Sequence, residues 1–128
     1  KRFKGIEMRI LAVSNDLSFL SELTDVLKKI VPEADVIKET DPLMACKYSF
    51  KNEVDFTFAD WEMKRMSFSD LTQFIKKERP RAKTYLIDKN AVALDALICD
   101  EFDGVIGYPF SLEELTKILK NNAIVNSR

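Results

Sequence analysis

The chain has 128 residues, of which 46% are hydrophobic, a size that suits one compact domain with a continuous core and leaves no room for two ordinary domains. Its 20 basic and 21 acidic side chains leave a net charge of -1, which gives no electrostatic reason to expect direct binding of nucleic acid. The absence of histidine excludes imidazole metal ligands, histidine-assisted acid–base catalysis and a histidine phosphoryl carrier.

The sequence also disfavours membrane-spanning and secreted proteins. No apolar run approaches the roughly 20 residues that a membrane helix needs, and no secretory leader is visible. Cys46 and Cys99 lie far apart within apolar helical patterns, so we expect buried free thiols and a reducing, cytoplasmic setting. The chain begins at Lys1 rather than at a methionine, which fits a fragment, with Met8 as a candidate natural start.

The first half of the chain alternates short apolar runs with helical periodicity. Residues 10–13 form a buried strand run, after which leucine and isoleucine recur at spacings of three and four over residues 20–30, as one face of a helix requires. Pro32 ends this helix, and residues 36–37 form a second, shorter and more polar strand. Asp41, with a proline next to it, then offers the N-cap of a second helix.

The second half continues the same alternation. Residues 56–59 form the third apolar run, and Ser67 can cap a helix that ends before Pro80. Residues 85–87 form the fourth run, and a helical pattern follows over residues 91–98.

A fifth strand, residues 105–106, precedes a capping box that begins at Ser111 and opens the last helix. Five strand–helix units with short connections predict an α/β fold of the flavodoxin-like, doubly wound type, in which helices cover both faces of a parallel sheet. The polar second run suits an edge strand, and the continuous first and third runs suit the centre, which gives a strand order of 2-1-3-4-5. We expect this domain over residues 8–120, with 1–7 and 121–128 as terminal extensions or linker.

Polar side chains gather where the predicted strands end. In a doubly wound sheet, ligands bind outside the carboxyl ends of the strands, near the point where the strand order reverses. Carboxylates at that edge favour a hard divalent cation, or pKa values raised by mutual repulsion. Asp16 is equally well explained as a helix N-cap, Asp88 as a turn residue and Glu62 as a solvent-exposed side chain. The candidate pocket residues are Ser14, Asn15, Asp16, Asp60, Glu62, Asp88, Lys89, Tyr108 and Pro109, with Asp16, Asp60 and Glu62 as candidate metal ligands.

Three segments resemble the receiver domains of response regulators (CheY-like domains), in the same order along the chain. The strand that delivers the phosphoacceptor aspartate in that family resembles FTFADWEM (56–63). The family's last strand, its Lys-Pro-Phe element and its last helix resemble GVIGYPFSLEEL (104–115), and its first strand and acidic cluster resemble ILAVSND (10–16). The resemblance implies a receiver fold, Asp60 at the phosphoacceptor position, and a cis peptide bond before Pro109.

The departures from the family's pattern concern the phosphorylation pocket. Receivers usually place two adjacent acids after the first strand to hold Mg²⁺, and here those positions read Ser14 and Asn15. Asp88 stands where the family has a threonine or serine that contacts the phosphoryl group, and Tyr108 stands where it has the lysine before the proline. Phosphoryl transfer needs cations to stabilise the spreading negative charge. We therefore expect impaired phosphorylation, and Mg²⁺ binding that is weak or absent.

The resemblance implies a receiver domain of two-component (phosphorelay) signal transduction, which we expect to be atypical, to act through protein–protein contacts and to have no enzymatic activity. Its expected partners are a sensor histidine kinase or phosphotransfer protein, a second copy docked through the last two helices and strand five, and an output domain outside this chain. The alternative is an ordinary Mg²⁺-dependent, phospho-accepting receiver that uses Asp60. A small α/β enzyme is disfavoured, because the chain has only three glycines and no G-x-G-x-x-G or P-loop pattern.

Overall fold

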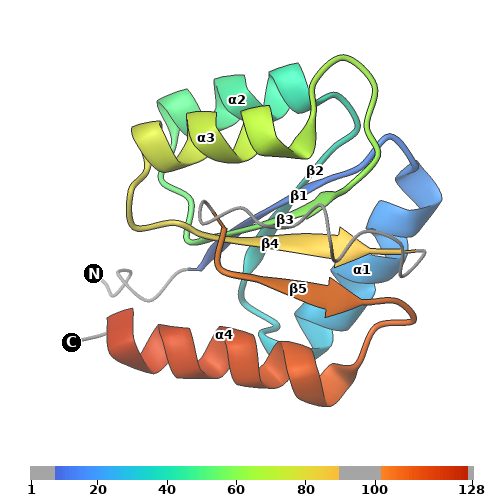
Figure 1. The fold of residues 1–128 in the computed structure, drawn as a ribbon. Helices are drawn as coiled ribbons and strands as arrows, with labels where there is room; N and C mark the ends of the chain where they lie inside the picture. The colour runs from blue at the N-terminus through green and yellow to red at the C-terminus, as the bar shows by residue number, and fades with distance from the viewer. Residues whose placement is uncertain (1–7, 90–101, 127–128) are drawn as a thin grey trace.

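The computed structural model describes residues 8–89 and 102–126 of the chain. That part contains strands and helices in the alternation that the sequence predicts (Figure 1). The elements are β1 (Arg9–Val13), α1 (Leu17–Ile30), β2 (Asp35–Glu39), α2 (Pro42–Lys51), β3 (Phe56–Asp60), α3 (Phe68–Glu78), β4 (Lys83–Asp88), β5 (Gly104–Gly107) and α4 (Leu112–Asn126).

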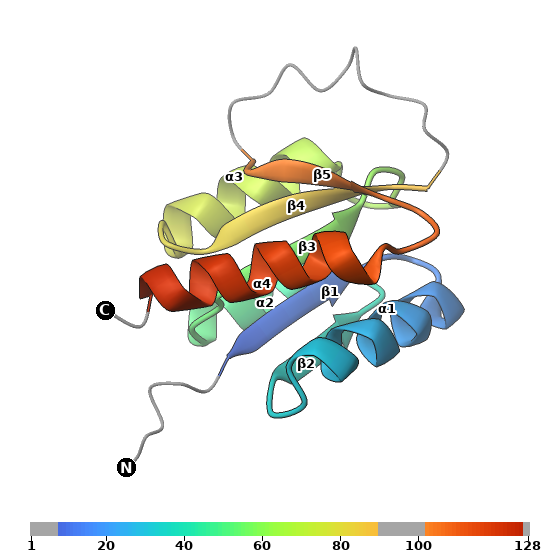
Figure 2. The same ribbon diagram turned by 90° about the horizontal axis from the view of Figure 1, so that it is seen from below.

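The strands form one sheet in the order β2-β1-β3-β4-β5, and every neighbouring pair is parallel. Helices α1 and α4 cover one face of the sheet, and α2 and α3 cover the other (Figure 1 and Figure 2). The predicted fold class and the predicted strand order are both confirmed. The more polar β2 lies at one edge, as its sequence predicted, and the continuous β1 and β3 lie inside the sheet.

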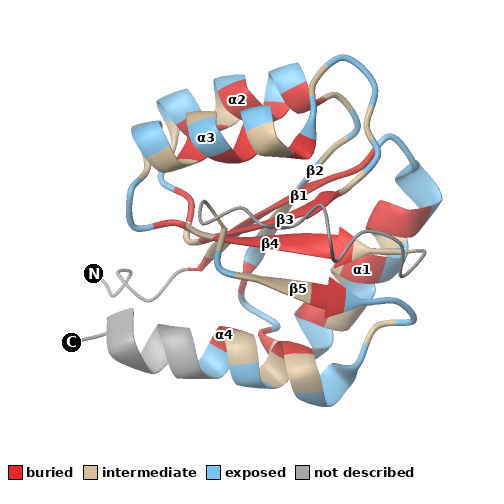
Figure 3. Cartoon of the chain, in the orientation of Figure 1, coloured by how far each residue is buried: buried red, intermediate tan, exposed pale blue. Residues whose placement is uncertain are grey.

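Two hydrophobic layers make up the interior, one on each side of the sheet. All residues of β3 are buried, and they alternate between the two layers because successive side chains of a strand point to opposite faces. Phe56 and Phe58 pack in the layer under α1 and α4, whereas Ala59 packs in the layer under α2 and α3. Phe58 also stacks on Tyr85 of β4, with 5.6 Å between the ring centroids. Figure 3 shows this buried band running along the strands and the inward sides of the helices.

The helices begin where the sequence places capping side chains. Asp16, Asp41, Ser67 and Ser111 each accept a hydrogen bond from a backbone N–H in the first turn of the helix that follows. Such a cap satisfies an N–H group that has no partner inside the helix, and it typically stabilises a helix by about 1 kcal/mol. The cap on α1 also fixes the direction of the Asp16 side chain, which matters for the site described below.

Two expectations concern residues outside the described chain, and one expected domain boundary falls inside a helix. The helix expected over residues 91–98 and the second cysteine, Cys99, lie outside the described residues. Helix α4 continues to Asn126, so the expected domain boundary at residue 120 falls inside a helix. Cys46 is a buried free thiol, as expected, and burial raises its pKa.

A search of the described residues finds no helix with both the length and the apolar character needed to cross a membrane.

Replacing Phe58 with alanine is expected to lower the free energy of unfolding by about 3–5 kcal/mol, because the change removes a fully buried ring from the centre of the sheet. Phe50→Ala is the matched control, since Phe50 is 61% exposed on α2, and we expect a change within about 0.5 kcal/mol. Urea denaturation followed by circular dichroism measures both variants. Equal losses would contradict the burial of β3.

Candidate functional site

The carboxyl ends of the inner strands meet at one edge of the sheet. Asp60 is the last residue of β3, Asp88 is the last residue of β4, and Ser14 follows directly after β1. The strand register pairs Val13 with Ala59 and aligns the ends of β3 and β4. This edge is also where the strand order reverses, because β1 leads to β2 on one side and to β3 on the other. The structure thus brings Ser14, Asp60 and Asp88 to the same edge of the sheet.

Asp60 presents a carboxylate that is almost fully buried. The residue is 6% exposed, and its Oδ2 atom accepts a hydrogen bond of 2.9 Å from the Ser14 hydroxyl. The Lys89 Nζ atom lies 3.3 Å from the same oxygen. A buried carboxylate is costly unless hydrogen bonds and an opposite charge compensate for its lost hydration. Ser14 supplies the hydrogen bond and Lys89 supplies the charge.

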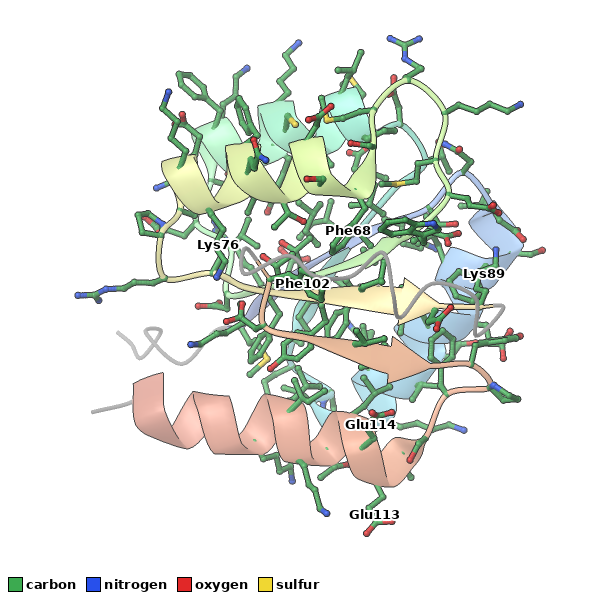
Figure 4. The ribbon with its side chains drawn as sticks, viewed as in Figure 1. Phe68, Lys76, Lys89, Phe102, Glu113 and Glu114 are labelled. Carbon is green, nitrogen blue, oxygen red and sulfur yellow. The ribbon has the colours of Figure 1, made fainter. Side chains whose placement is uncertain are left out.

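Lys89, labelled in Figure 4, follows β4 directly. Its ammonium group lies among groups from β3 and from the start of α1. Besides Asp60, its Nζ atom approaches Oδ2 of Asp16 at 3.9 Å and the centre of the Phe19 ring at 4.3 Å. The sequence marked Lys89 as a pocket residue without fixing the direction of its side chain. In the structure the side chain points to Asp60.

Asp16 serves both of the roles that the sequence left open. Its Oδ1 atom caps α1 by accepting a hydrogen bond of 3.2 Å from the Phe19 N–H, while its Oδ2 atom faces Lys89. Its backbone N–H in turn donates to the Ser14 hydroxyl at 3.1 Å. The cap therefore orients the carboxylate that helps to hold Lys89.

Asn15 links its own loop to two neighbouring loops, and among the described residues no hydrogen bond joins it to Asp60. Its side-chain amide donates to the Thr40 carbonyl at 2.7 Å, and its Oδ1 atom accepts from the Lys64 N–H at 2.6 Å. Both polar ends of the side chain are thus used to connect the loop after β1 with the loops after β2 and β3. We call this pair of hydrogen bonds the Asn15 strut, because it holds the three loops together.

Tyr108 directly follows β5, at the same edge of the sheet. The peptide bond between Tyr108 and Pro109 is cis, as the resemblance implied. The Tyr108 ring packs against Phe19 and Phe110, with centroid distances of 5.1 and 5.0 Å, and its hydroxyl donates to Glu22 Oε1 at 2.7 Å. The hydrogen bond to Glu22, followed by desolvation and nearby carboxylates, raises the pKa of Tyr108. The side chain is tied to α1, and its hydroxyl is directed at Glu22.

Two participants in this arrangement were missed by sequence reasoning. Phe19 carries a weak signal, because it adds an apolar residue to the buried face of α1 directly beside Leu20. Glu22 is exposed and carries no signal, since its role depends on a tyrosine 86 residues away in the sequence. A contact of this kind follows from the fold and not from local spacing.

The candidate metal ligands are not assembled as a cation site. Asp16 and Asp60 do converge, but on the ammonium group of Lys89. Glu62 is exposed in the loop after β3, and within the described chain no hydrogen bond or ion pair joins it to either aspartate. The described residues contain no group of three or more acidic, cysteine or histidine side chains that could hold a metal ion. The residues present therefore do not fit a divalent cation as a resident group.

The chain is similar to known proteins in its structure. No family model and no curated protein matches the sequence. Among solved structures, the signal receiver domain of an HD domain-containing protein from Pseudomonas fluorescens Pf-5 matches with a TM-score of 0.82 and 18% identity, over 99% of this chain and 94% of that one. A CheY-like response regulator receiver domain protein from Methanospirillum hungatei JF-1 matches with a TM-score of 0.82 and 18% identity, over 94% and 97% of the two chains.

A third match is the receiver domain of a sensor histidine kinase from Pseudomonas aeruginosa PAO1, whose active-site cleft coordinates a magnesium ion. It has a TM-score of 0.78 and 18% identity, over 91% of this chain and 98% of that one. At these identities the matches establish a shared fold. The chain has the fold of response regulator receiver domains.

The raised pKa of Tyr108 predicts a pH effect on stability. The native state favours protonated Tyr108, so the free energy of unfolding is expected to fall as the pH rises through the range in which an unfolded tyrosine loses its proton, about pH 10. Tyr108→Phe removes the titrating group and should show a smaller fall. Burial also raises the pKa of Tyr48, but that residue is the same in both proteins.

Urea denaturation at neutral and alkaline pH measures this difference. Glu22→Gln is expected to move the tyrosinate absorbance titration to lower pH, because it removes the acceptor carboxylate that raises the pKa. Identical alkaline behaviour of the wild type and Tyr108→Phe would contradict the assigned contact.

Proposed function

We propose that this chain, which has the fold of a response regulator receiver domain, works as an atypical receiver module of two-component (phosphorelay) signalling. In this proposal it acts through protein–protein contacts, and phosphorylation of Asp60 is weak or lost. The observation that carries the proposal is the pairing of buried Asp60 with Lys89 and Ser14 at the end of the central strand.

The position of Asp60 supports the receiver assignment. A buried carboxylate at the end of β3 is unusual as a purely structural feature, because it must be compensated in an apolar surrounding. In the family that the sequence resembles, this is the position of the phosphoacceptor. A signalling role without enzymatic activity accounts for a single compact domain of this fold, and a cytoplasmic setting is part of the proposal.

The surroundings of Asp60 support weak or lost phosphorylation. A phosphoryl group on Asp60 would spread negative charge that needs cations close by. Tyr108 stands in place of the family's lysine and directs its hydroxyl at Glu22, while Asp88 adds a further carboxylate to the same edge. Lys89 is the cation in contact with Asp60, and Asp16 shares it. The positive charge of Lys89 is therefore already balanced by two carboxylates.

The proposed partners are proteins. A sensor histidine kinase or a phosphotransfer protein remains the expected upstream partner, and an output domain outside this chain is the expected downstream one. We also propose a homodimer through β5 and the last two helices, although the first of these helices falls outside the described residues. Helix α4 carries the exposed Leu112, which is 53% accessible at the end nearest the site. Direct binding of nucleic acid or membrane is not part of the proposal.

A second candidate function is the ordinary Mg²⁺-dependent receiver. It is favoured by the retention of an aspartate at the phosphoacceptor position and by the convergence of Asp16 on the same edge. The two candidates differ in one measurable outcome, which is the formation of an acyl phosphate on Asp60.

Incubation with Mg²⁺ and acetyl phosphate is expected to leave the wild-type chain without a phosphoryl adduct. The reason is that Lys89 and Ser14 both contact Oδ2 of the carboxylate, and residues 8–89 and 102–126 show no ion pair of Asp60 with a further cation. Intact mass spectrometry, with acid and base treatment of the product, detects the acid-stable and base-labile adduct that an acyl phosphate would give. Asp60→Asn is the control that lacks the acceptor. An adduct on the wild type that is absent from Asp60→Asn would establish the ordinary receiver.

A further inference from the structure

We propose that Lys89 is a built-in counter-ion that takes the place of a divalent cation beside Asp60. The inference rests on the proposed function in that it concerns the same carboxylate, and it adds how that carboxylate is regulated. In this reading the charge of Asp60 is balanced by a side chain of the chain itself, so the state of the site does not depend on Mg²⁺.

The buried carboxylate of Asp60 needs a positive charge beside it. Two side chains of the described residues contact the Asp60 carboxylate, and both do so at Oδ2. Ser14 is neutral, and its hydroxyl satisfies one hydrogen-bonding position. Lys89, at 3.3 Å, carries the compensating charge. A buried ion pair loses its compensation when one partner is removed, so Asp60 depends on Lys89.

Lys89 is held in place from several directions. Its backbone follows the last residue of β4, which is fixed in the sheet. Its ammonium group lies over the Phe19 ring at 4.3 Å and within 3.9 Å of the Asp16 carboxylate. A cation over an aromatic face is stabilised by the ring quadrupole, and more strongly when it is partly desolvated. The Lys89 side chain is 27% exposed, so this position is a specific one and not a loose surface pairing.

Lys89 and a divalent cation would compete for the same oxygen of Asp60. A divalent cation needs several oxygen ligands at about 2.0–2.6 Å, most of them carboxylates, carbonyls or waters. The positions after β1 offer a buried hydroxyl, on Ser14, and the amide of Asn15, whose two polar ends are already used. A Mg²⁺ ion at Asp60 Oδ2 would lie beside an ammonium group of like charge. Lys89 and Mg²⁺ therefore compete at this oxygen.

The test compares Mg²⁺ responses of the full chain with those of Lys89 variants. Lys89→Met keeps the length of the side chain and removes the charge, whereas Lys89→Arg keeps the charge. Magnesium chloride is titrated, and binding is followed by thermal denaturation and by the fluorescence of Trp61, the only tryptophan and the residue next to Asp60. Ligand binding to the native state raises the melting temperature, by an amount that grows with the logarithm of the ligand concentration divided by Kd.

The wild type and Lys89→Arg are expected to show no response to millimolar Mg²⁺. Lys89→Met is expected to be less stable without metal and to bind Mg²⁺ at least about tenfold more tightly than the wild type, the scale on which outer-shell groups tune metal sites. Adding Asp60→Asn to Lys89→Met should abolish the response. A wild-type response to Mg²⁺ that requires Asp60 overturns the proposal, as does a Lys89→Met variant that is indifferent to Mg²⁺.

A double-mutant cycle keeps the test decisive if Lys89→Met folds poorly. Lys89→Met should destabilise the wild type and have little further effect in the Asp60→Asn background, because the charge to be balanced is then absent. Equal destabilisation in both backgrounds overturns the proposal. The proposed function fails on a different result, a phosphoryl adduct on the wild type, which leaves the coupling between Lys89 and Asp60 intact.

Discussion

The buried carboxylate of Asp60 must be compensated, and this need explains the main contacts at the carboxyl edge of the sheet. Asp60 ends the only strand in the described sheet whose residues are all buried, so its carboxylate has little access to water. The groups that satisfy it come from the loop after β1 and from the residue after β4, on both sides of β3. Phe19 and Asp16 then hold the cation, and Tyr108 packs on Phe19. These contacts thus lead back to a single carboxylate.

The fold could be predicted from the sequence because its signals are local and repeated. Each strand is a short apolar run, and each described helix begins at a side chain that can cap it, such as Asp41 or Ser67. The order of the strands follows from burial, since a largely apolar run such as residues 56–59 suits the inside of a sheet covered on both faces. The positions of Asp60 and Asp88 at one edge follow in turn from the parallel arrangement.

The contacts within the site could not be predicted in the same way. A lysine side chain has many rotamers, and the direction of Lys89 is decided by Asp16, Phe19 and Asp60, which lie far from it in the sequence. The same limit applies to Glu62, because its position in the sequence places it near the edge of the sheet without orienting it toward Asp60. Local spacing locates a side chain, and tertiary partners decide where it points.

The strut formed by Asn15 bears on how such a site can evolve. Replacing Asn15 with aspartate would supply an acid at a position where receivers usually carry one, but it would remove the amide that donates to Thr40. Likewise, a lysine in place of Tyr108 would give up the bond to Glu22 and the packing on Phe19 and Phe110. Both of these side chains therefore make structural contacts that the receiver-type residue would not make. Introducing the receiver-type residue at either position would therefore remove an existing contact before a metal site is complete, so a single substitution toward metal binding carries a structural cost.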